Sequence, residues 1–253
     1  MKSVEESKEI EFFELNKYTP EEEQPVEHIQ MFQKKRQVNE QELNNEQRRI
    51  YEFMSNNPFE DTPQPPDVDL NMLQNLGNAT SKSKSSDKKW RITYENGTEY
   101  EGNIVENKSS KDFEQPILFG NFIFPNGDKY EGSVGKRAEG TYTHQNGVKY
   151  KGQFYKLAKS GNGIQSFPSG TIYEGMFKEN MYHGKGNINF LNGDNYNGTF
   201  NNGKRNHIGK YSYPSGETVI GDWQNDMLHG NARYQFTNGK KMISAFENSA
   251  IKL

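Results

Sequence analysis

The chain has 253 residues, and only 31% of them are hydrophobic, which is too few to fill a thick, multilayered core. The formal net charge of −3 is too small to indicate nucleic-acid binding, and the absence of cysteine excludes disulfides and thiolate chemistry. Aromatic residues nevertheless make up 13% of the chain, and its 24 glycines indicate many turns. Any core is therefore expected to be thin and aromatic.

Residues 1–88 are predicted to form an extended acidic arm with one helix. They contain 18 acidic and 11 basic residues, a net charge of −7, which leaves 16 acidic and 20 basic residues and a charge of +4 for the remainder. Good helix formers fill residues 25–54, and Pro25 suits the first helical position. The apolar stripe of this segment is thin, so the helix is expected to need a partner surface.

An extended segment is expected after the helix, because four prolines fall in NPFEDTPQPPDVDLNMLQNLG, residues 57–77. The run SKSKSSDKK, residues 81–89, predicts a solvated linker, so residues 89–253 are assigned to a separate domain. The start of the chain has neither a secretory signal nor the arginines of a transit peptide. No apolar run reaches the roughly 18 residues of a membrane span.

Regular spacing of glycines and aromatic residues marks an internal repeat from about residue 92. Each repeat has an anchor residue three positions after a turn glycine, and the last four steps between anchors are each 23 residues. The first step is 30 residues, which indicates an insertion within residues 107–115. The turn glycines are Gly97, Gly127, Gly147, Gly170, Gly193, Gly216 and Gly239, and the anchors are Tyr100, Tyr130, Tyr150, Tyr173, Tyr196, Val219 and Met242.

The repeat predicts antiparallel strand pairs joined by tight turns whose glycines take a positive φ. Because side chains alternate along a strand, the anchor, a glycine two positions later and a large residue two further on share one face. The mid-strand glycines are Gly102, Gly132, Gly152, Gly175, Gly198 and Gly221. Rings on this face are expected to cover the glycine gaps, and ring pairs add about 0.5–1.5 kcal/mol each beyond area burial.

The expected fold class is an all-β repeat, namely an elongated single-layer antiparallel sheet of stacked hairpins preceded by the arm. The stretch YEGMFKENMYHGKG, residues 173–186, closely resembles the MORN repeat (membrane occupation and recognition nexus). YEGSV at 130, YKGQF at 150 and YNGTF at 196 match the same pattern, so the resemblance extends over about residues 92–246. The chain departs from the pattern at Val219, where the tyrosine is lost, and an altered surface is expected at that repeat.

The large aromatic residues are the first candidate site, as a face for binding a protein partner. A single-layer sheet has no second layer to cover them, and large exposed apolar patches usually mark contacts. The alternative is that the rings bury one another. The residues of this candidate face are Tyr100, Tyr130, Tyr150, Phe154, Tyr173, Phe177, Tyr196, Phe200 and Trp223.

Basic residues that gather near the hairpin loops are the second candidate site, as an edge for an acidic partner such as anionic lipid or an acidic protein tail. The alternative is edge protection and solubility. The candidate residues are Lys136, Arg137, Lys185, Lys204 and Arg205, and Lys156 and Lys159 lie in equivalent loops.

No catalytic, cofactor-binding or metal site is predicted. The glycines are periodic and do not form a phosphate-binding loop. His183 and His229 precede glycines at equivalent repeat positions, about two repeats apart, which is too far for one ion. The repeat itself explains both histidines as turn residues.

The resemblance implies a non-enzymatic structural scaffold that binds other proteins of a large cytoskeletal assembly. The chain is similar to short MORN-only proteins of the cilium. This similarity implies that the protein is located in the cytoplasm, in the axoneme, and belongs to a complex like the radial spoke. One alternative is a membrane-associated tether that binds anionic phospholipids. Another is an accessory structural subunit of a multi-subunit enzyme complex.

Overall fold

The computed structural model describes residues 45–66, 70–73, 76–105, 117–135 and 137–251. Over these residues the chain forms an open antiparallel sheet of sixteen strands that follow one another in sequence order, so the predicted fold class of stacked hairpins is confirmed. The chain divides into two compact units. One comprises Met1–Pro63 with His183–Leu253, and the other comprises Gln64–Tyr182.

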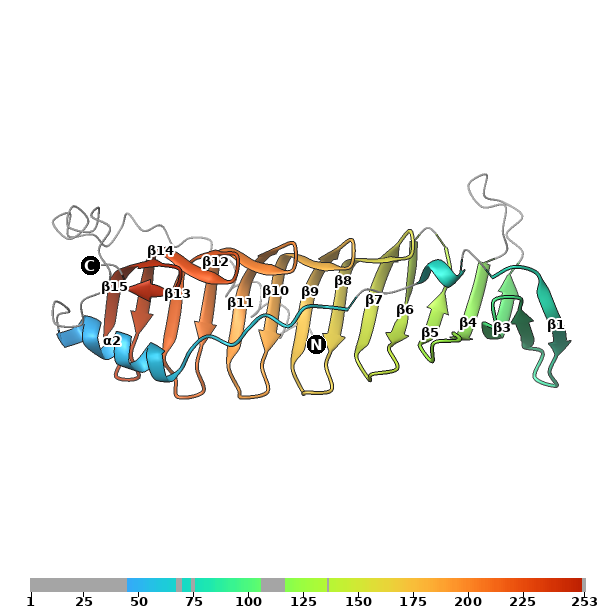
Figure 1. Ribbon diagram of the computed structural model, residues 1–253, viewed down its shortest axis with the longest axis horizontal. Helices are drawn as coiled ribbons and strands as arrows, with labels where there is room; N and C mark the ends of the chain where they lie inside the picture. The colour runs from blue at the N-terminus through green and yellow to red at the C-terminus, as the bar shows by residue number, and fades with distance from the viewer. Residues whose placement is uncertain (1–44, 67–69, 74–75, 106–116, 136, 252–253) are drawn as a thin grey trace. The chain divides into compact units, whose positions relative to one another are not determined.

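The helices of the described chain are α2, Asn45–Asn56, and the short 3-10 helix η4, Leu70–Leu73 (Figure 1). The strands of the Gln64–Tyr182 unit are β1 (Ala79–Lys84), β2 (Trp90–Tyr94), β3 (Glu99–Val105), β4 (Ile117–Ile123), β5 (Lys129–Ser133), β6 (Arg137–Thr143), β7 (Lys149–Tyr155), β8 (Ala158–Ser166) and β9 (Ile172–Lys178). The next strand is β10 (Met181–Asn189), and the other unit continues with β11 (Asn195–Asn201), β12 (Lys204–Ser212), β13 (Thr218–Gln224), β14 (Met227–Gln235), β15 (Lys241–Glu247) and β16 (Ala250–Ile251).

The arm differs from its prediction in two places. Helix α2 ends two residues beyond the predicted segment 25–54, and residues 25–44 of that segment lie outside the described residues. The prediction of a solvated linker at 81–89 is wrong for its first half, because β1 pairs with β2 there. Lys82 and Lys84 place their ammonium groups 4.4 and 5.3 Å from the centre of the Trp90 ring, and this cation–π packing gives a polar segment a reason to stay on the sheet.

Two kinds of turn alternate along the strands. In the first kind, each predicted turn glycine has a φ between +80° and +101°, a conformation that glycine adopts without strain. The Gly127 N–H donates to the Phe124 carbonyl at 2.9 Å, and the side-chain oxygen of Asn126 accepts the Asp128 N–H at 3.0 Å. The side chain of the asparagine before the glycine therefore stabilises the turn by a hydrogen bond to the backbone two residues later.

In the second kind, two-residue turns have positive φ at both positions, as type I′ hairpin turns require. The turns are Lys156–Leu157, Glu179–Asn180, Asn202–Gly203, Asn225–Asp226 and Asn248–Ser249, with φ values from 49° to 81°. The sequence gives little sign of them, because only one contains the favoured Asn-Gly pair. Neighbouring strands hold the others in this conformation.

Anchor tyrosines lie across pairs of glycines that face each other on adjacent strands. Gly152 of β7 pairs with Gly163 of β8, and a Cβ atom on Gly163 would come within 2.4 Å of the Tyr150 ring. The Tyr150 hydroxyl then donates to the Gln153 carbonyl at 2.7 Å. Tyr100, Tyr130, Tyr173 and Tyr196 donate in the same way to the carbonyl three positions later, at 2.6–3.2 Å. The glycine is required because the ring fills the space of its missing side chain.

The repeat anchored at Val219 fills the same space without a ring. Gly221 faces Ala232 in place of a second glycine, and a Cβ atom on Gly221 would lie 2.5 Å from the Ala232 Cβ. Leu228 lies next to the pair, 3.0 Å from the same position. Losing the tyrosine therefore leaves room for one methyl group, and the strand pairing is kept.

Replacing Gly163 with alanine should destabilise the fold by about 1–3 kcal/mol, because the new methyl group overlaps the Tyr150 ring. In a Tyr150→Val background, which copies the native combination of Val219 with Ala232, the same replacement should cost clearly less. Urea unfolding of the two single variants and the double variant measures this coupling. Strictly additive losses would show that the ring does not impose the glycine.

The sheet should unfold in alkali, because burial raises the pKa of its tyrosines. The pKa of Tyr100 is raised to about 12, chiefly by burial, and burial also raises the pKa values of Tyr130, Tyr150, Tyr182, Tyr196, Tyr211, Tyr213 and Tyr234. The stability that the neutral tyrosines contribute is complete below their unfolded pKa of about 10 and is lost as pH rises through the folded values.

Circular dichroism and tyrosinate absorbance, followed together from pH 9 to pH 12, test this expectation. We expect strand loss and ionisation of several tyrosines in one steep step above pH 10. Ionisation of most tyrosines near pH 10 with an unchanged strand signal would contradict it.

Candidate protein-interaction site

Three aromatic residues of the unit formed by Met1–Pro63 and His183–Leu253 make a continuous surface, which we call the aromatic platform. It consists of Tyr211 in β12, Tyr213 just after β12, and Trp223 in β13. The Tyr211 ring lies 5.0 Å from Tyr213 and 6.2 Å from Trp223, centroid to centroid. The Trp223 indole N–H donates to the Gly209 carbonyl at 3.2 Å, which fixes the orientation of the ring.

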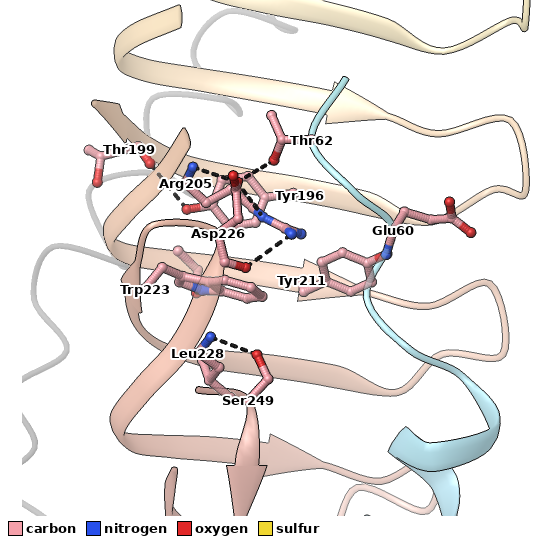
Figure 2. A network of polar contacts seen from close by, with 11 residues as sticks. Glu60, Thr62, Tyr196, Thr199, Arg205, Tyr211, Trp223, Asp226, Leu228 and Ser249 are labelled. Carbon is pink, nitrogen blue, oxygen red and sulfur yellow. Dashed lines mark hydrogen bonds and ion pairs between the residues drawn. The ribbon is translucent and has the colours of Figure 1, made fainter. Parts of the chain in front are cut away.

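The aromatic platform is covered by a segment of the arm. The Phe59 ring lies 4.8 Å from both Tyr211 and Trp223 and 6.2 Å from Tyr213. As a result Tyr211 and Trp223 are no more than 1% exposed. Residues 57–62 thus supply part of a second layer, which we call the strap (Figure 2).

Polar contacts fix the position of the strap along the platform. The Glu60 N–H donates to the Tyr211 hydroxyl at 2.9 Å, and this hydroxyl donates to Asp194 at 2.5 Å. The Asn192 side chain donates to the Glu60 carboxylate at 2.9 Å, and the Tyr213 hydroxyl donates to the Asn57 carbonyl at 3.2 Å. Burial raises the pKa of Tyr211 and the hydrogen bond to Asp194 raises it further, so its hydroxyl keeps its proton.

Helix α2 continues the cover from the strap onto the neighbouring strands, and Figure 1 shows it in front of β13 to β15. The Phe53 ring packs edge-on against Tyr213 at 5.0 Å and against Tyr234 at 5.8 Å. The Arg49 guanidinium lies 4.9 Å from the centre of the Phe236 ring, and Ile50 is fully buried. The helix therefore has the partner surface that its thin apolar stripe required.

A buried arginine and a turn aspartate stand at the end of the strap (Figure 2). Arg205 is 2% exposed, and its guanidinium lies 4.7 Å from the centre of the Trp223 ring. Its Nε donates to Asp226 Oδ1 at 3.3 Å and its Nη2 to the Asp226 carbonyl at 3.1 Å. Asp226 Oδ1 also accepts the Thr62 hydroxyl at 2.5 Å, so the ion pair ties the strap to the sheet.

Asp226 belongs to a repeated arrangement in which the second residue of a type I′ turn bonds a backbone 21 residues earlier. Asp226 Oδ1 accepts the Arg205 N–H at 2.9 Å, and Ser249 Oγ accepts the Leu228 N–H at 3.0 Å. Asn180 does the same for the Lys159 N–H at 2.8 Å in the other unit. At these three turns the side chain links its hairpin to the preceding one.

In the Gln64–Tyr182 unit, a buried lysine contacts the same arm further along. Lys159 is fully buried, and its Nζ donates to the Pro66 carbonyl at 2.7 Å and to the Gln165 side chain at 3.2 Å. Its ammonium also lies 5.7 Å from the Tyr150 ring centre and 5.6 Å from that of Phe177. Ring faces and a carbonyl oxygen thus stabilise a charge that burial would otherwise penalise.

All the residues predicted as an exposed aromatic face are buried, so the expectation of exposure is wrong. The rings pack on one another, on the glycine pairs and, at the platform, against the strap. Their exposed fractions lie between 0 and 3%, for Tyr100, Tyr130, Tyr150, Phe154, Tyr173, Phe177, Tyr196, Phe200 and Trp223.

The candidate basic residues have different surroundings. Arg137, Lys185 and Lys204 are exposed, and Lys136 lies outside the described residues. Assigning Arg205 to an exposed edge is wrong, because alternation along β12 directs it inward, next to Lys204, which faces outward. Lys159 is likewise an inner-face residue of β8.

The sequence does contain a signal for the two buried cations. Lys159 and Arg205 stand nine positions after their anchors, where other repeats have Tyr182 and Leu228. A position that two repeats fill with large apolar residues is expected to face inward. The repeat phase could therefore have identified both cations as residues of the inner face.

The outward face of the Gln64–Tyr182 unit exposes a group of apolar side chains, which we call the outward patch. It consists of Ile164 in β8 with Ile172 and Met176 in β9, each about 40% exposed. Ile164 pairs with Glu174, which places Ile172 and Met176 diagonally on either side of it. Glu174 lies between Ile172 and Met176, and Lys151 pairs with Ile164 on its other side, so charged side chains stand within and beside the patch.

Clusters of metal-ligating residues and membrane-spanning helices are both lacking among the described residues. No group of three His, Asp or Glu side chains there could hold a metal ion. No helix among the same residues has the length and apolarity to cross a bilayer.

The fold and these surfaces define a class: a β-hairpin repeat array whose inner face holds a segment of its own chain. Residues 150–172, 173–194, 196–218 and 220–241 match the MORN repeat family. These four segments are therefore MORN repeats, as the YEGMF-type stretches indicated. No curated protein matches the sequence.

Several solved structures align with this chain at low sequence identity. One is the TCP domain of SAS-4 (dCPAP) from Drosophila melanogaster in complex with a proline-rich motif of Ana2 (dSTIL), at 14% identity and a TM-score of 0.41, covering 66% of this chain and 90% of that chain. Another is the wild-type TCP10 domain of Danio rerio CPAP, at 13% identity and a TM-score of 0.31, covering 68% of this chain and 92% of that chain.

Replacing Phe59 with alanine should expose Trp223 and lower stability by about 1–3 kcal/mol, because the ring that covers the platform is lost. A Trp90→Phe background leaves Trp223 as the single tryptophan, so its emission maximum and acrylamide quenching report the cover. Phe119→Ala removes the same ring from a 56% exposed position in the other unit and should change neither signal. An unshifted Trp223 emission in the Phe59 variant would contradict the assignment of the strap.

Proposed function

We propose that this protein is a non-enzymatic scaffold that binds other proteins of a cytoskeletal assembly through the outward face of its MORN repeats. The observation that carries the proposal is the outward patch of Ile164, Ile172 and Met176. Strap and ring packing occupy the inner face, whereas these side chains remain accessible on adjacent strands. Apolar groups clustered on a polar surface favour a protein partner.

The finer part of the proposal is a ciliary axoneme complex that resembles a radial spoke. Its support is the likeness, noted from the sequence, of the MORN repeats at residues 150–241 to those of short MORN-only proteins of the cilium. A repeat sheet in which each hairpin contacts its neighbours suits a spacer with several docking positions.

The double variant Ile172→Glu with Met176→Glu should co-purify with at least tenfold less of each protein partner than the wild-type chain. The reason is that two carboxylates replace the apolar contact area. The measurement is quantitative mass spectrometry of proteins that co-purify with the tagged full chain from ciliated cells. Met227→Glu, at a 40% exposed methionine of the other unit, is the matched control and should retain the partners. Circular dichroism checks that each variant keeps its sheet.

Enrichment of axonemal proteins with the wild-type chain and the control variant, and their loss from the double variant, would support the proposal. Equal recovery with all three chains would contradict the role of the patch. Enrichment of one enzyme complex would favour an accessory subunit instead.

A membrane tether is the second candidate, favoured by the exposed Lys185 and Lys204 of one unit. Anionic phospholipid attracts such side chains in a salt-dependent way. Sedimentation with anionic vesicles that is lost in Lys185→Glu with Lys204→Glu, but kept with neutral substitutions on the outward patch, would support the tether over the scaffold.

A further inference from the structure

We propose that Thr62 is a phosphorylation site for a proline-directed protein kinase, and that phosphorylation holds the strap off the aromatic platform. Thr62 is followed by Pro63, the dipeptide that such kinases recognise. A residue before proline is restricted to extended backbone, the form in which kinases bind their substrates. Residues 58–66 form no helix or strand, so detaching the strap breaks no strand pairing.

The surroundings of the Thr62 hydroxyl suit its unmodified form only. The hydroxyl is a donor to Asp226 Oδ1 at 2.5 Å, and Thr62 is 6% exposed. A phosphate ester on this oxygen has no proton to donate, carries a charge of about −1.5 to −2, and needs space for three further oxygens. At this distance from a carboxylate the group meets both an overlap and a like charge.

Arg205 does not offset that charge while the strap is docked. Its Nε and Nη2 already donate to Asp226, and its planar group lies against the Trp223 ring. Nη1 has no hydrogen-bond partner, so a phosphate could pair with one nitrogen. The single positive charge of Arg205 cannot neutralise both the Asp226 carboxylate and a phosphate dianion. We therefore expect the phosphorylated strap to be released, and not to be held by a pairing of its phosphate with Arg205.

A kinase reaches Thr62 only in the released state, because the docked hydroxyl is buried. The contacts described for the strap are separate from any strand pairing: the Phe59 ring, the Glu60 N–H and carboxylate, the Asn57 carbonyl and the Thr62 hydroxyl. A small released population is thus expected, and phosphorylation makes it dominant because the modified strap no longer fits. The inference goes beyond the scaffold role, since release does not depend on which proteins bind the outward patch.

The chemical step is an ordinary phosphoryl transfer from a nucleoside triphosphate. Thr62 Oγ1 attacks the γ-phosphorus, the new O–P bond forms, and the bond from that phosphorus to the β,γ-bridging oxygen breaks. The hydroxyl proton passes to the catalytic carboxylate of the kinase, and the nucleoside diphosphate leaves.

The test uses the full chain in the Trp90→Phe background, a purified proline-directed kinase and ATP, with peptide mass spectrometry to locate the phosphate. We expect phosphate on Thr62, a red shift of the Trp223 emission, and stronger acrylamide quenching. The variant Phe59→Ala populates the released state and should be phosphorylated at Thr62 roughly tenfold faster or more. If Thr62 had a structural role only, the Phe59→Ala variant and the parent chain would not differ in the rate of phosphorylation at Thr62.

Thr19→Ala is the matched control, because Thr19–Pro20 is the other Thr-Pro pair in the sequence. This variant should show the same Trp223 response as the parent chain, whereas Thr62→Val should take up no phosphate at this peptide and show no response. Thr62→Val could itself expose Trp223. In that case the Trp223 emission of Thr62→Ser, which keeps the hydroxyl, is compared before and after phosphorylation.

Two results would overturn the proposal. The first is no phosphate on Thr62 even in the Phe59→Ala variant. The second is a chain phosphorylated on Thr62 whose Trp223 remains shielded, which would mean that Arg205 accepts the phosphate with the strap in place.

Discussion

The tyrosine-anchored hairpins of this sheet depend on a ring that lies across two facing glycines. The ring needs the space of two missing side chains, and its hydroxyl bonds a carbonyl three positions later in the same strand. One contact therefore fixes the residue type at both glycines, the pairing of two strands and the orientation of the ring. Where Val219 replaces the tyrosine, Ala232 replaces a glycine, so a methyl group occupies space that the ring fills in other repeats.

Filling the inner face in this way determines how the protein can make contacts. The rings bury one another, and the strap and α2 cover part of them, so little of the inner face remains for an outside partner. Arg205 and Lys159 are then buried among rings, where a cation is stabilised by the ring faces and by oxygen acceptors. Through Asp226 and through the Pro66 carbonyl, both cations contribute to holding the arm.

The proposed partner binding and the proposed release of the strap use separate surfaces. The outward patch is exposed while the strap is docked, which suits the proposed binding of protein partners. The aromatic platform is accessible only when the strap leaves it, so its exposure is subject to control by a change at the strap. The contacts described for the strap do not include strand pairing, which makes this segment easier to release than a strand of the sheet.

The repeat phase could be read from the sequence because the spacing of glycines and aromatic residues is itself the consequence of local packing. Turn glycines, anchor tyrosines and mid-strand glycines all follow from rules that act within about 23 residues. The type I′ turns were not evident, since residues such as Lys156 and Leu157 adopt positive φ only because both flanking strands hold them there. Strand β1 was missed for a similar reason, because its polar residues are held by Trp90 rather than by their own propensity.

The sequence by itself thus determined the hairpin array and the aromatic and glycine residues of its inner face. Only the tertiary structure decided what covers that face, because the contacts of Phe59 with Trp223 and of Thr62 with Asp226 join residues 164 positions apart. No local pattern encodes such contacts. They depend on where the arm returns along the sheet, and that path is set by packing against strands that come much later in the chain.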